Sequence, residues 1–356
     1  MSALKALVLS GGSGTRLRPL THTMAKQLVP VANKPVIVHC LEALRELGVT
    51  EVGIIVGAHG DEIARVLGTG RSLGLGLRFI HQEAPLGLAH CVITAAGFLG
   101  DDDFVLLLGD NVFAGGLAAE AERFRRERPD ALLVTKKVED PRNFGVAVTD
   151  ADGRVVSLAE KPREPISDLA VTGAYFFTSA IHGSTGAISP SGRGELEITD
   201  AIAHMVDSGF RVLASTYADY WADTGTVGDL LDCNRVFLER LGNGLTGDVD
   251  EGTEISGRVL IEPGALVRGS RLRGPVAIGG GSVVEDSDVG PDVTVGPDSR
   301  ITNASVSDTI LLEGSRVSDI GRLHGSVVGR RARVTGDRGV AGRLTVGDDT
   351  TVEVRS

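Results

Sequence analysis

The sequence is poor in cysteine and contains no long hydrophobic run. Its three cysteines, Cys40, Cys91 and Cys233, lie far apart and form no C-x-x-C pair. Three such thiols exclude a full disulfide framework and argue against a zinc site, so we expect buried, reduced thiols. No apolar run approaches the ~20 residues of a membrane span, and the N-terminus lacks the regions of a signal peptide. A cytoplasmic protein without a membrane or nucleic-acid partner is therefore expected.

Acidic residues are absent before Glu42, although the whole chain has a formal net charge of −11. The same stretch contains five basic residues: Lys5, Arg16, Arg18, Lys26 and Lys34. An acidic protein that binds a polyanion must build the attraction where the ligand sits. The first forty-one residues are therefore predicted to bind an anion.

A glycine-rich loop lies inside this basic stretch, directly after the apolar run of residues 4–9. Gly11, Gly12 and Gly14 let backbone N–H groups turn inward and approach phosphate oxygens closely. No Lys-Ser/Thr pair follows Gly14, which excludes a Walker loop. Leu17 stands where a dinucleotide fingerprint needs its last glycine. The loop is predicted to hold a triphosphate, and the alternative is a tight turn that binds nothing.

Strands and helices alternate after this loop. Apolar residues recur at helical spacing over 36–48 and 61–67, whereas 52–56, 77–80 and 103–108 are short apolar runs. This alternation predicts a parallel sheet that helices cover on both faces. Ligands of such sheets bind at the carboxyl ends of the strands.

Two aspartates occupy positions that suit a metal ion. Asp110 follows the most hydrophobic of these runs, and Asp223 follows Trp221, the only tryptophan. Mg²⁺ prefers one or two carboxylates together with phosphate oxygens and waters, so the two acids could share one ion. Either could instead cap a following helix, for which Thr224 and Thr226 are also adequate.

Two glutamines are candidate readers of a nucleotide base. A glutamine amide donates and accepts hydrogen bonds together, which matches the N3–H and carbonyl groups of thymine or uracil. Gln27 and Gln82 could serve in this way, or could be ordinary surface residues. His81 and His90 are assigned packing or hydrogen bonding and no chemistry.

Extended strands over 131–138, 143–148 and 155–160 lead to Glu160-Lys161-Pro162. A lysine at such a strand end can meet a phosphate, and the adjacent glutamate can bind sugar hydroxyls. The alternative is an ordinary exposed ion pair. Further along, Arg193 and Glu195 are treated as possible neighbours of a ligand only.

The C-terminal part lacks aromatic residues and lysine. All fourteen aromatics lie at or before Phe237, and no lysine follows Lys161. Apolar residues then recur every six positions, as in Ile255, Ile261 and Val267, which is typical of a hexapeptide β-helix. The phase slips between runs, so loops or imperfect coils are expected. Residues 304–356 read as β-rich, but their coils cannot be traced.

The run G-G-S-G-T-R-L-R-P-L-T from Gly11, followed by K-Q-L-V-P-V from Lys26 and Lys34-Pro35, resembles the signature of the sugar-phosphate nucleotidylyltransferases. Within that family the chain is most similar to members that use dTTP and glucose 1-phosphate, in the longer form with an added C-terminal region. The resemblance implies an α/β fold, with a Rossmann-like, mixed but mainly parallel sheet domain over 1–240. A left-handed parallel β-helix domain over 250–356 would follow.

The resemblance also implies roles for individual residues. Nucleotide binding is expected of Gly11, Gly12, Gly14, Thr15, Gln27, Gln82 and Gly87. Sugar-phosphate binding is expected of Gly145, Glu160, Lys161, Thr172 and Tyr175. Catalytic roles are expected of Arg16, Lys26, Asp110, Lys161 and Asp223, of which Asp110 and Asp223 would hold Mg²⁺.

The implied reaction is attack by the phosphate of glucose 1-phosphate on the α-phosphorus of dTTP. The same chemistry with UTP or another sugar phosphate is the nearest alternative. Added acyl transfer by the β-helix is a second alternative, for which His324 is the one histidine after residue 204. A binding protein without catalysis is a third. A homo-oligomer is expected because β-helix ends and flat faces invite partners.

Overall fold

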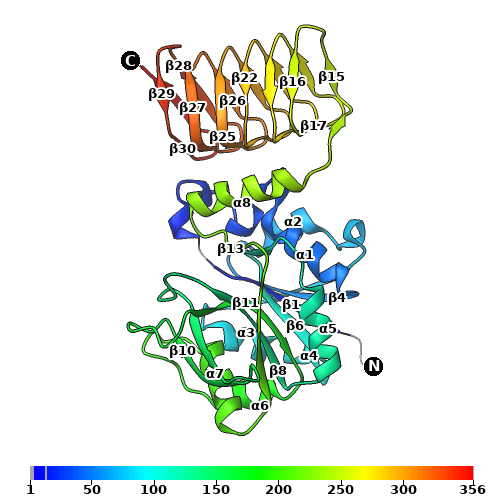
Figure 1. Cartoon of the computed structure of the whole chain (residues 1–356), viewed down its shortest axis with the longest axis vertical. Helices are drawn as coiled ribbons and strands as arrows, with labels where there is room; N and C mark the ends of the chain where they lie inside the picture. The colour runs from blue at the N-terminus through cyan, green and yellow to red at the C-terminus, as the bar shows by residue number, and fades with distance from the viewer. Residues whose placement is uncertain (1–3, 13, 356) are drawn as a thin grey trace. The chain divides into compact units, whose positions relative to one another are not determined.

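The computed structural model describes residues 4–12 and 14–355, which pack as two units (Figure 1). The first unit contains the chain up to Gly12 together with Ile37–Asp223. The second unit contains the segment after Gly12 up to Val36 together with the chain from Thr224 onward. Ser13, which belongs to the predicted phosphate loop, lies outside the described residues. The predicted boundaries of 1–240 and 250–356 stay a prediction.

The first unit is built on a mixed sheet whose middle is parallel, as predicted. Four parallel strands lie in the order β6-β1-β4-β5, namely Phe104–Leu108, Lys5–Ser10, Glu51–Val56 and Gly76–His81. β11 (Leu169–Phe177) runs antiparallel to β6 and continues the sheet. Beyond it lie β8 (Ala131–Lys137), β9 (Gly145–Thr149), β10 (Val155–Glu160) and β12 (Val212–Thr216). A separate antiparallel pair joins β7 (Asn111–Phe113) to β13 (Trp221–Asp223).

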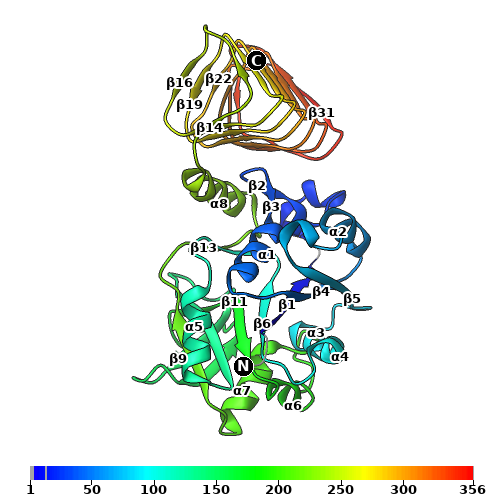
Figure 2. The same ribbon diagram turned by 90° about the vertical axis from the view of Figure 1, so that its right-hand side faces the viewer.

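Helices cover both faces of this sheet (Figure 2). They are α1 (Val36–Glu46), α2 (Gly60–Leu67), α3 (Leu88–Thr94), α4 (Ala96–Leu99), α5 (Ala118–Glu127), α6 (Ile181–Thr185) and α7 (Ile198–Asp207), with the short 3₁₀ turn η4 (Arg71–Leu73). Alternate side chains of β11 show the two layers. Tyr175 and Phe177 pack in one core with α3, α6 and α7. Phe176 points the other way, and its ring lies 5.6 Å from that of Phe124 in α5.

The second unit is a three-sided parallel β-helix (Figure 2). One side contains β14 (Gly244–Leu245), β17 (Val259–Ile261), β20 (Val276–Ile278), β23 (Val293–Val295) and β30 (Thr345–Val346). Another contains β15 (Asp248–Val249), β18 (Leu266–Arg268), β21 (Val283–Glu285), β24 (Arg300–Thr302), β26 (Arg316–Ser318), β28 (Arg333–Gly336) and β31 (Thr351–Val354). The third contains β16 (Glu254–Ser256), β19 (Arg271–Arg273), β22 (Asp288–Val289) and β29 (Ala341–Gly342). The long strands β25 (Ser305–Leu311) and β27 (Arg322–Val328) join the first and third sides.

The register of the coils explains the slip in the six-residue period. Ile261 pairs with Ile278 and Ile278 pairs with Val295, a step of 17 residues that recurs in the hydrogen bonds between coils. Each such coil is one residue shorter than three complete six-residue sides. Later coils differ in length: Val295 pairs with Leu311 after 16 residues and Val328 with Val346 after 18. The imperfect coils that the sequence predicts are therefore present. Paired strands also continue through the untraced segment, where Val334 pairs with Val352.

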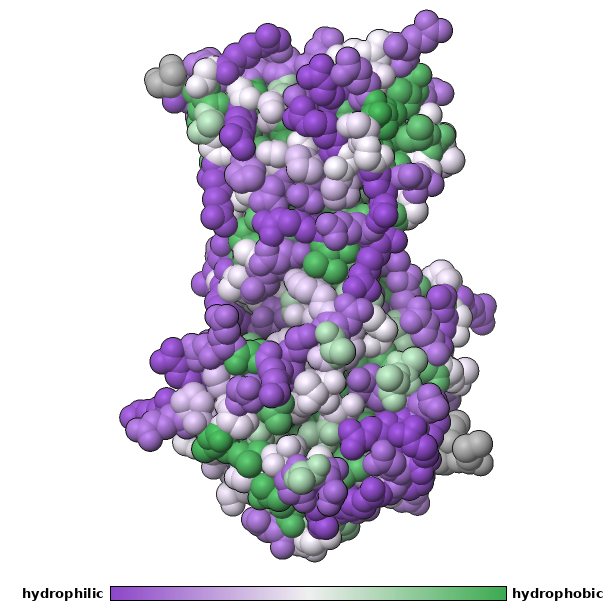
Figure 3. All heavy atoms as spheres, in the orientation of Figure 1, coloured by the Kyte–Doolittle hydropathy of each residue, from purple (hydrophilic) through white to green (hydrophobic). Residues whose placement is uncertain are grey.

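Aliphatic ladders form the core of the β-helix, which explains the absence of aromatic residues there. Ile261, Ile278, Val295 and Val328 are completely buried. Branched aliphatic side chains stack well between identical coils, and each coil buries the one beneath it. Hydrophilic residues predominate on the face of the β-helix visible in Figure 3.

The second unit also contains the segment after Gly12, which we call the basic arm (residues 14–36). It consists of η1 (Thr15–Leu17), η2 (Leu20–His22), η3 (Lys26–Leu28), and a short hairpin of β2 (Pro30–Val31) and β3 (Lys34–Pro35). Helix α8 (Val227–Arg240) precedes the first coil. Within the described chain, no helix is long and apolar enough to cross a bilayer.

All three cysteines are free and buried, as predicted, and each lies in a helix. Burial raises the pKa of the Cys91 thiol to about 12. Burial also raises the pKa of the Cys233 thiol, and the nearby Asp229 and Asp232 raise it further. These thiols stay protonated at neutral pH and act as small apolar groups.

Candidate active site

The two predicted metal-binding aspartates lie on neighbouring chain segments of the first unit. Asp110 stands between β6 and β7, and Asn111, the next residue, pairs with Asp223 across the β7–β13 ladder. A strand follows Asp110, so that side chain does not cap a helix. Helix α8 is capped by Thr226 through a capping box with Asp229. The helix-cap alternatives for both aspartates are therefore excluded.

A tryptophan and an asparagine orient this pair of strand ends. The Trp221 indole N–H donates to Asn111 Oδ1 at 2.9 Å and to the Thr172 carbonyl at 3.0 Å. Asn111 Nδ2 in turn donates to Asp110 Oδ1 at 2.9 Å. The Phe144 ring packs edge-on against Trp221, with ring centres 5.3 Å apart. The sequence analysis did not predict that Asn111 links Trp221 to Asp110, although its position next to Asp110 was the available signal.

Thr172 lies in β11 and is hydrogen-bonded to two neighbouring strands. Its hydroxyl donates to the Val134 carbonyl at 2.8 Å, its carbonyl accepts from Trp221, and only 1% of the residue is exposed. The hydroxyl therefore bonds to the neighbouring strand β8, and the carbonyl holds the indole of Trp221. Contact of Thr172 with a sugar stays a prediction.

The predicted base and phosphate residues of the first unit meet at the carboxyl ends of β1, β4 and β5. Gln82 directly follows β5, and a Cβ atom at Gly11 would lie 3.5 Å from Gln82 Oε1. Gln82 Nε2 lies 3.0 Å from His90 Nδ1, so the amide nitrogen donates and the ring nitrogen accepts. This contact turns the amide oxygen toward Gly11 and gives His90 the hydrogen-bonding role expected of it. Gly11 and Gly12 are exposed.

Gly87 marks a close backbone crossing. Its φ is 104°, and a Cβ atom there would lie 2.3 Å from the Leu196 carbonyl oxygen. Leu196 also donates its N–H to Leu86 O at 2.7 Å and accepts from Ala89 N at 3.0 Å. A glycine is required here because the two chain segments touch through their backbones. The crossing joins the loop after Gln82 to the segment that precedes α7.

A charged cluster surrounds Glu160. Its Oε2 accepts from Thr199 Oγ1 at 3.1 Å, and its Oε1 accepts from Arg193 Nη2 at 3.1 Å. Arg193 also donates to the buried Glu197 at 2.8 Å, so one guanidinium links two carboxylates. Lys161 Nζ lies 3.7 Å from Glu160 Oε1. Glu197 and Thr199 were missed, and Arg193 was treated only as a neighbour, although the acid-rich run 195–200 beside an arginine was a usable signal.

Gly145 and Tyr175 complete this cluster. A Cβ atom at Gly145 would lie 2.7 Å from Thr199 Cγ2 and 3.4 Å from Glu160 Oε2, so a larger residue would displace the carboxylate. Burial raises the pKa of the Tyr175 phenol, and the charge of Glu160 raises it further. Tyr175 therefore remains neutral at any physiological pH.

The remaining predicted residues lie on the basic arm of the second unit. Gly14 has a φ of 64°, and its carbonyl accepts from Thr21 Oγ1 at 2.7 Å. A Cβ atom at Gly14 would lie 3.0 Å from Lys26 Cβ, so the arm folds back to bring Lys26 beside the loop. Thr15 and Arg16 are exposed.

Gln27 stands out among the arm residues. Only 1% of it is exposed, and its Oε1 is buried with no hydrogen-bond partner among the described residues. A buried, unpaired amide oxygen is costly, and a pyrimidine N3–H is a donor that would satisfy it. The orphaned oxygen fits the predicted contact with a base.

The chain is similar to known proteins in sequence and in structure. A model of the family "Nucleotidyl transferase" matches residues 5–240. The chain is 49% identical to a glucose-1-phosphate thymidylyltransferase of Streptomyces antibioticus, over 99% of this chain and all of the relative. It is 48% identical to one of Streptomyces griseus, with the same coverage of both chains. A crystal structure from Bacillus anthracis, provisionally named a glucose-1-phosphate thymidylyltransferase and holding sucrose, superposes with a TM-score of 0.62. It is 32% identical and covers 68% of this chain and 98% of its own.

The Gly87 crossing yields a stability test. We expect Gly87→Ala to lower the free energy of unfolding by roughly 2 kcal/mol or more, because the methyl group strains the backbone and meets the Leu196 carbonyl. Urea unfolding followed by the fluorescence of Trp221, in the same unit, measures this change. Gly97→Ala in α4 is the control: a Cβ atom there meets nothing within 4 Å, so it should be neutral or stabilising by up to about 1 kcal/mol. Equal unfolding midpoints for Gly87→Ala and wild type would contradict the crossing.

Proposed function

The chain belongs to the nucleotidyl transferase family, and we propose that it transfers a thymidylyl group from dTTP to the phosphate of α-D-glucose 1-phosphate. The products are dTDP-glucose and pyrophosphate. The observation that carries this proposal is the pairing of Asn111, the residue after Asp110, with Asp223 across the β7–β13 ladder. This register puts the backbone positions of the two aspartates near each other at the ends of two paired strands. The likeness along the whole chain to the two Streptomyces enzymes supports the choice of substrates.

The carboxylate pair fits a divalent cation. Asp110 and Asp223 offer hard oxygen ligands, which Mg²⁺ prefers, and the ion usually completes its shell with phosphate oxygens and waters. In residues 4–12 and 14–355, no cluster of three or more His, Cys, Asp or Glu side chains could hold a metal alone. When bound, Mg²⁺ neutralises phosphate charge and polarises the phosphorus under attack.

The side chains contribute by positioning the two substrates and by neutralising their negative charge. The sugar phosphate is already an anion, so its attack needs no general base. Its oxygen forms a bond to the α-phosphorus of dTTP while the bond from that phosphorus to the bridging oxygen breaks, and pyrophosphate leaves. This displacement requires two anions to be held in line, which costs free energy unless cations face them. We assign Arg16 and Lys26 to the triphosphate and the leaving pyrophosphate.

The glycines and the Glu160 cluster orient the two substrates. Gly11, Gly12, Gly14 and Thr15 cradle phosphate oxygens through backbone N–H groups. Lys161 has a φ of 42° and is exposed at the end of β10, where its ammonium group can meet the sugar phosphate.

Glu160 accepts hydrogen bonds from sugar hydroxyls in this proposal. Its carboxylate is held by Thr199 and Arg193. Gly145 and Tyr175 are assigned to the same sugar-binding cluster around Glu160. Gly87 holds the loop after Gln82 against the segment that precedes α7.

Base recognition falls to Gln27, Gln82 and the loop up to Gly87. The unpaired Gln27 Oε1 is suited to accept from the N3–H of the base. Thymine and uracil share that group, so UTP is the closest competing nucleotide. We further propose that the protein acts in the cytoplasm as a homo-oligomer.

A substrate panel tests the proposal. The protein is incubated with Mg²⁺, with dTTP, UTP, ATP, CTP or GTP, and with glucose, mannose or N-acetylglucosamine 1-phosphate, and pyrophosphate is measured. We expect the highest kcat/KM for dTTP with glucose 1-phosphate. Preference for UTP in direct competition would move the assignment to uridylyl transfer, and no pyrophosphate from dTTP with any sugar would refute it.

The carboxylate pair is tested by substitution. Asp110→Asn and Asp223→Asn should each lower kcat by at least about a hundredfold, because each removes an anionic ligand of the Mg²⁺ that stabilises the transition state. Titration of Mg²⁺ with dTTP should also change the emission of Trp221, the only tryptophan, through its link to Asn111. Both variants should lose that change. Asp101→Asn, at an exposed turn, is the control, and wild-type rates in either site variant would exclude the pair from the reaction.

A further inference from the structure

The basic arm lies in the N-terminal part of the sequence but packs in the unit of the β-helix. Its three 3₁₀ turns each span three residues, and none has a side-chain cap. Ordering such a segment costs roughly 1–2 kcal/mol per residue in backbone entropy. The arm therefore needs outside contacts to keep one conformation, and the coils supply them at two places.

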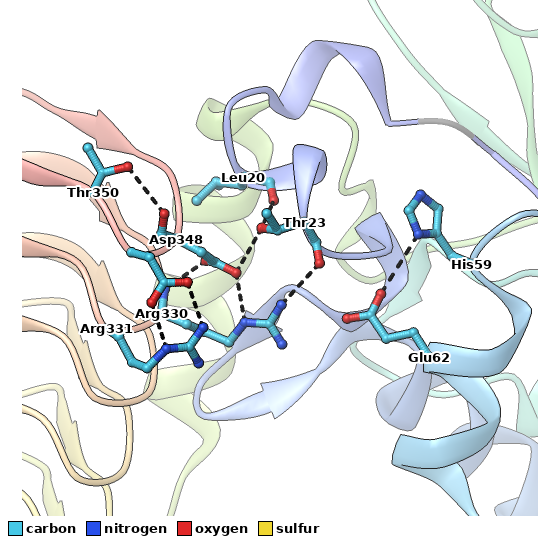
Figure 4. Close-up of polar contacts among 9 residues, drawn as sticks. Leu20, Thr23, His59, Glu62, Arg330, Arg331, Asp348 and Thr350 are labelled. Atoms are coloured by element: carbon cyan, nitrogen blue, oxygen red, sulfur yellow. Dashed lines mark hydrogen bonds and ion pairs between the residues drawn. The ribbon is translucent and has the colours of Figure 1, made fainter.

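The first contact joins Thr23 to the last coils (Figure 4). Thr23 Oγ1 donates to Asp348 Oδ2 at 2.8 Å. The Asp348 side chain is 1% exposed and also accepts from Arg330, from its backbone N and its Nε, each at 2.8 Å. Arg330 Nη2 donates to the Thr23 carbonyl at 3.3 Å. Asp348 and Arg330 thus hold the hydroxyl and the carbonyl of Thr23.

The second contact holds the tip of the arm hairpin. Ala32 and Asn33 have φ values of 49° and 61°, as a tight two-residue turn requires. Ala32 N donates to Asn234 Oδ1 at 2.9 Å, and Asn33 Nδ2 donates to the Val295 carbonyl at 2.9 Å. Asn234 in α8 is completely buried, and the same oxygen accepts from Thr294 at 2.7 Å. Helix α8 and a middle coil therefore fix the hairpin.

Lys26 and Gln27 lie between these two contacts along the chain. We propose that the β-helix positions the basic arm for the nucleoside triphosphate, with Thr23, Asp348 and Asn234 as positioning residues for Lys26 and Gln27. The inference rests on the proposed function, in which Lys26 and Gln27 bind the nucleotide. Pre-ordering a binding segment raises affinity because the ligand no longer has to order it. The β-helix thus sets nucleotide affinity without touching the nucleotide.

A neighbouring ion pair offers a matched control. Arg331 and Asp349 follow Arg330 and Asp348 by one residue each and join through two hydrogen bonds of 2.7 Å. Their side chains are 59% and 60% exposed, and their side-chain hydrogen bonds are to each other. The Arg331 guanidinium lowers the pKa of the Asp349 carboxyl. Substitution there changes the same residue types on the same coils and spares Thr23.

The experiment compares Thr23→Val, Asp348→Asn and Asp349→Asn with wild type. We expect Thr23→Val and Asp348→Asn to raise KM for dTTP about tenfold, as expected when binding must order the arm. KM for glucose 1-phosphate should stay within about twofold in the same variants. Amide hydrogen exchange of residues 14–31 should be faster in both, while that of β20 and β21 is unchanged. Asp349→Asn should match wild type in every measurement, and Thr23→Ser, which keeps the hydroxyl, should restore both values.

Two results would overturn the proposal. One is unchanged hydrogen exchange of the arm in Thr23→Val and Asp348→Asn. The other is an equal rise in KM for both substrates, which would indicate a general structural defect. Hydrogen exchange needs no turnover, so absence of pyrophosphate from the wild type would refute the proposed function while the exchange data still decide whether the coils hold the arm.

Discussion

The indole N–H of Trp221 lies between the Asn111 side chain and the Thr172 carbonyl, and the candidate site depends on that shared donor. Trp221 is half-buried, and a donor that loses its acceptors costs free energy, up to about 1–3 kcal/mol where it is fully buried. Through Asn111 the same chain of hydrogen bonds reaches Asp110, and through the β7–β13 ladder it sets Asp223 opposite. This hydrogen-bond network therefore joins the three strands β7, β11 and β13 and reaches the Asp110 carboxylate.

The carboxylates of the candidate site need positive charge near them. Two adjacent carboxylates repel each other unless a cation lies between them, and the chain as a whole has a net charge of −11. In the Glu160 cluster, Arg193 offsets the repulsion between two carboxylates because it donates hydrogen bonds to both Glu160 and Glu197. The acid-free arm places basic residues on a separate segment, which the β-helix holds. A reaction between two anions requires cations to face them, and the basic arm supplies such cations in an otherwise acidic chain.

Short-range features were predictable from the sequence. The apolar run before Asp110 and the six-residue ladder of the C-terminal part gave the strands and the β-helix, because side-chain periodicity records local burial. Thr226, one of three candidate caps with Asp223 and Thr224, is the cap of α8. A ligand role for Gly14 and Gly87 stays a prediction from the motif, and their positive φ values give a backbone reason for glycine at both positions.

Long-range contacts were not predictable in the same way. Nothing local to Thr23 indicates that its partner is Asp348, which lies 325 residues later. The single tryptophan was noted, but its hydrogen bonds to Asn111 and Thr172 depend on three strands meeting. The uneven length of the coils appeared in the sequence only as a slip of phase. Pairings of this kind are set by the fold as a whole, and a single sequence does not record them.

The most direct test of the account is crystallographic. Crystals of the protein grown with dTTP and Mn²⁺ in place of Mg²⁺ give an anomalous signal that locates the metal. The account predicts a peak within roughly 2.2 Å of carboxylate oxygens of both Asp110 and Asp223. A metal bound to the nucleotide but away from both aspartates would contradict it.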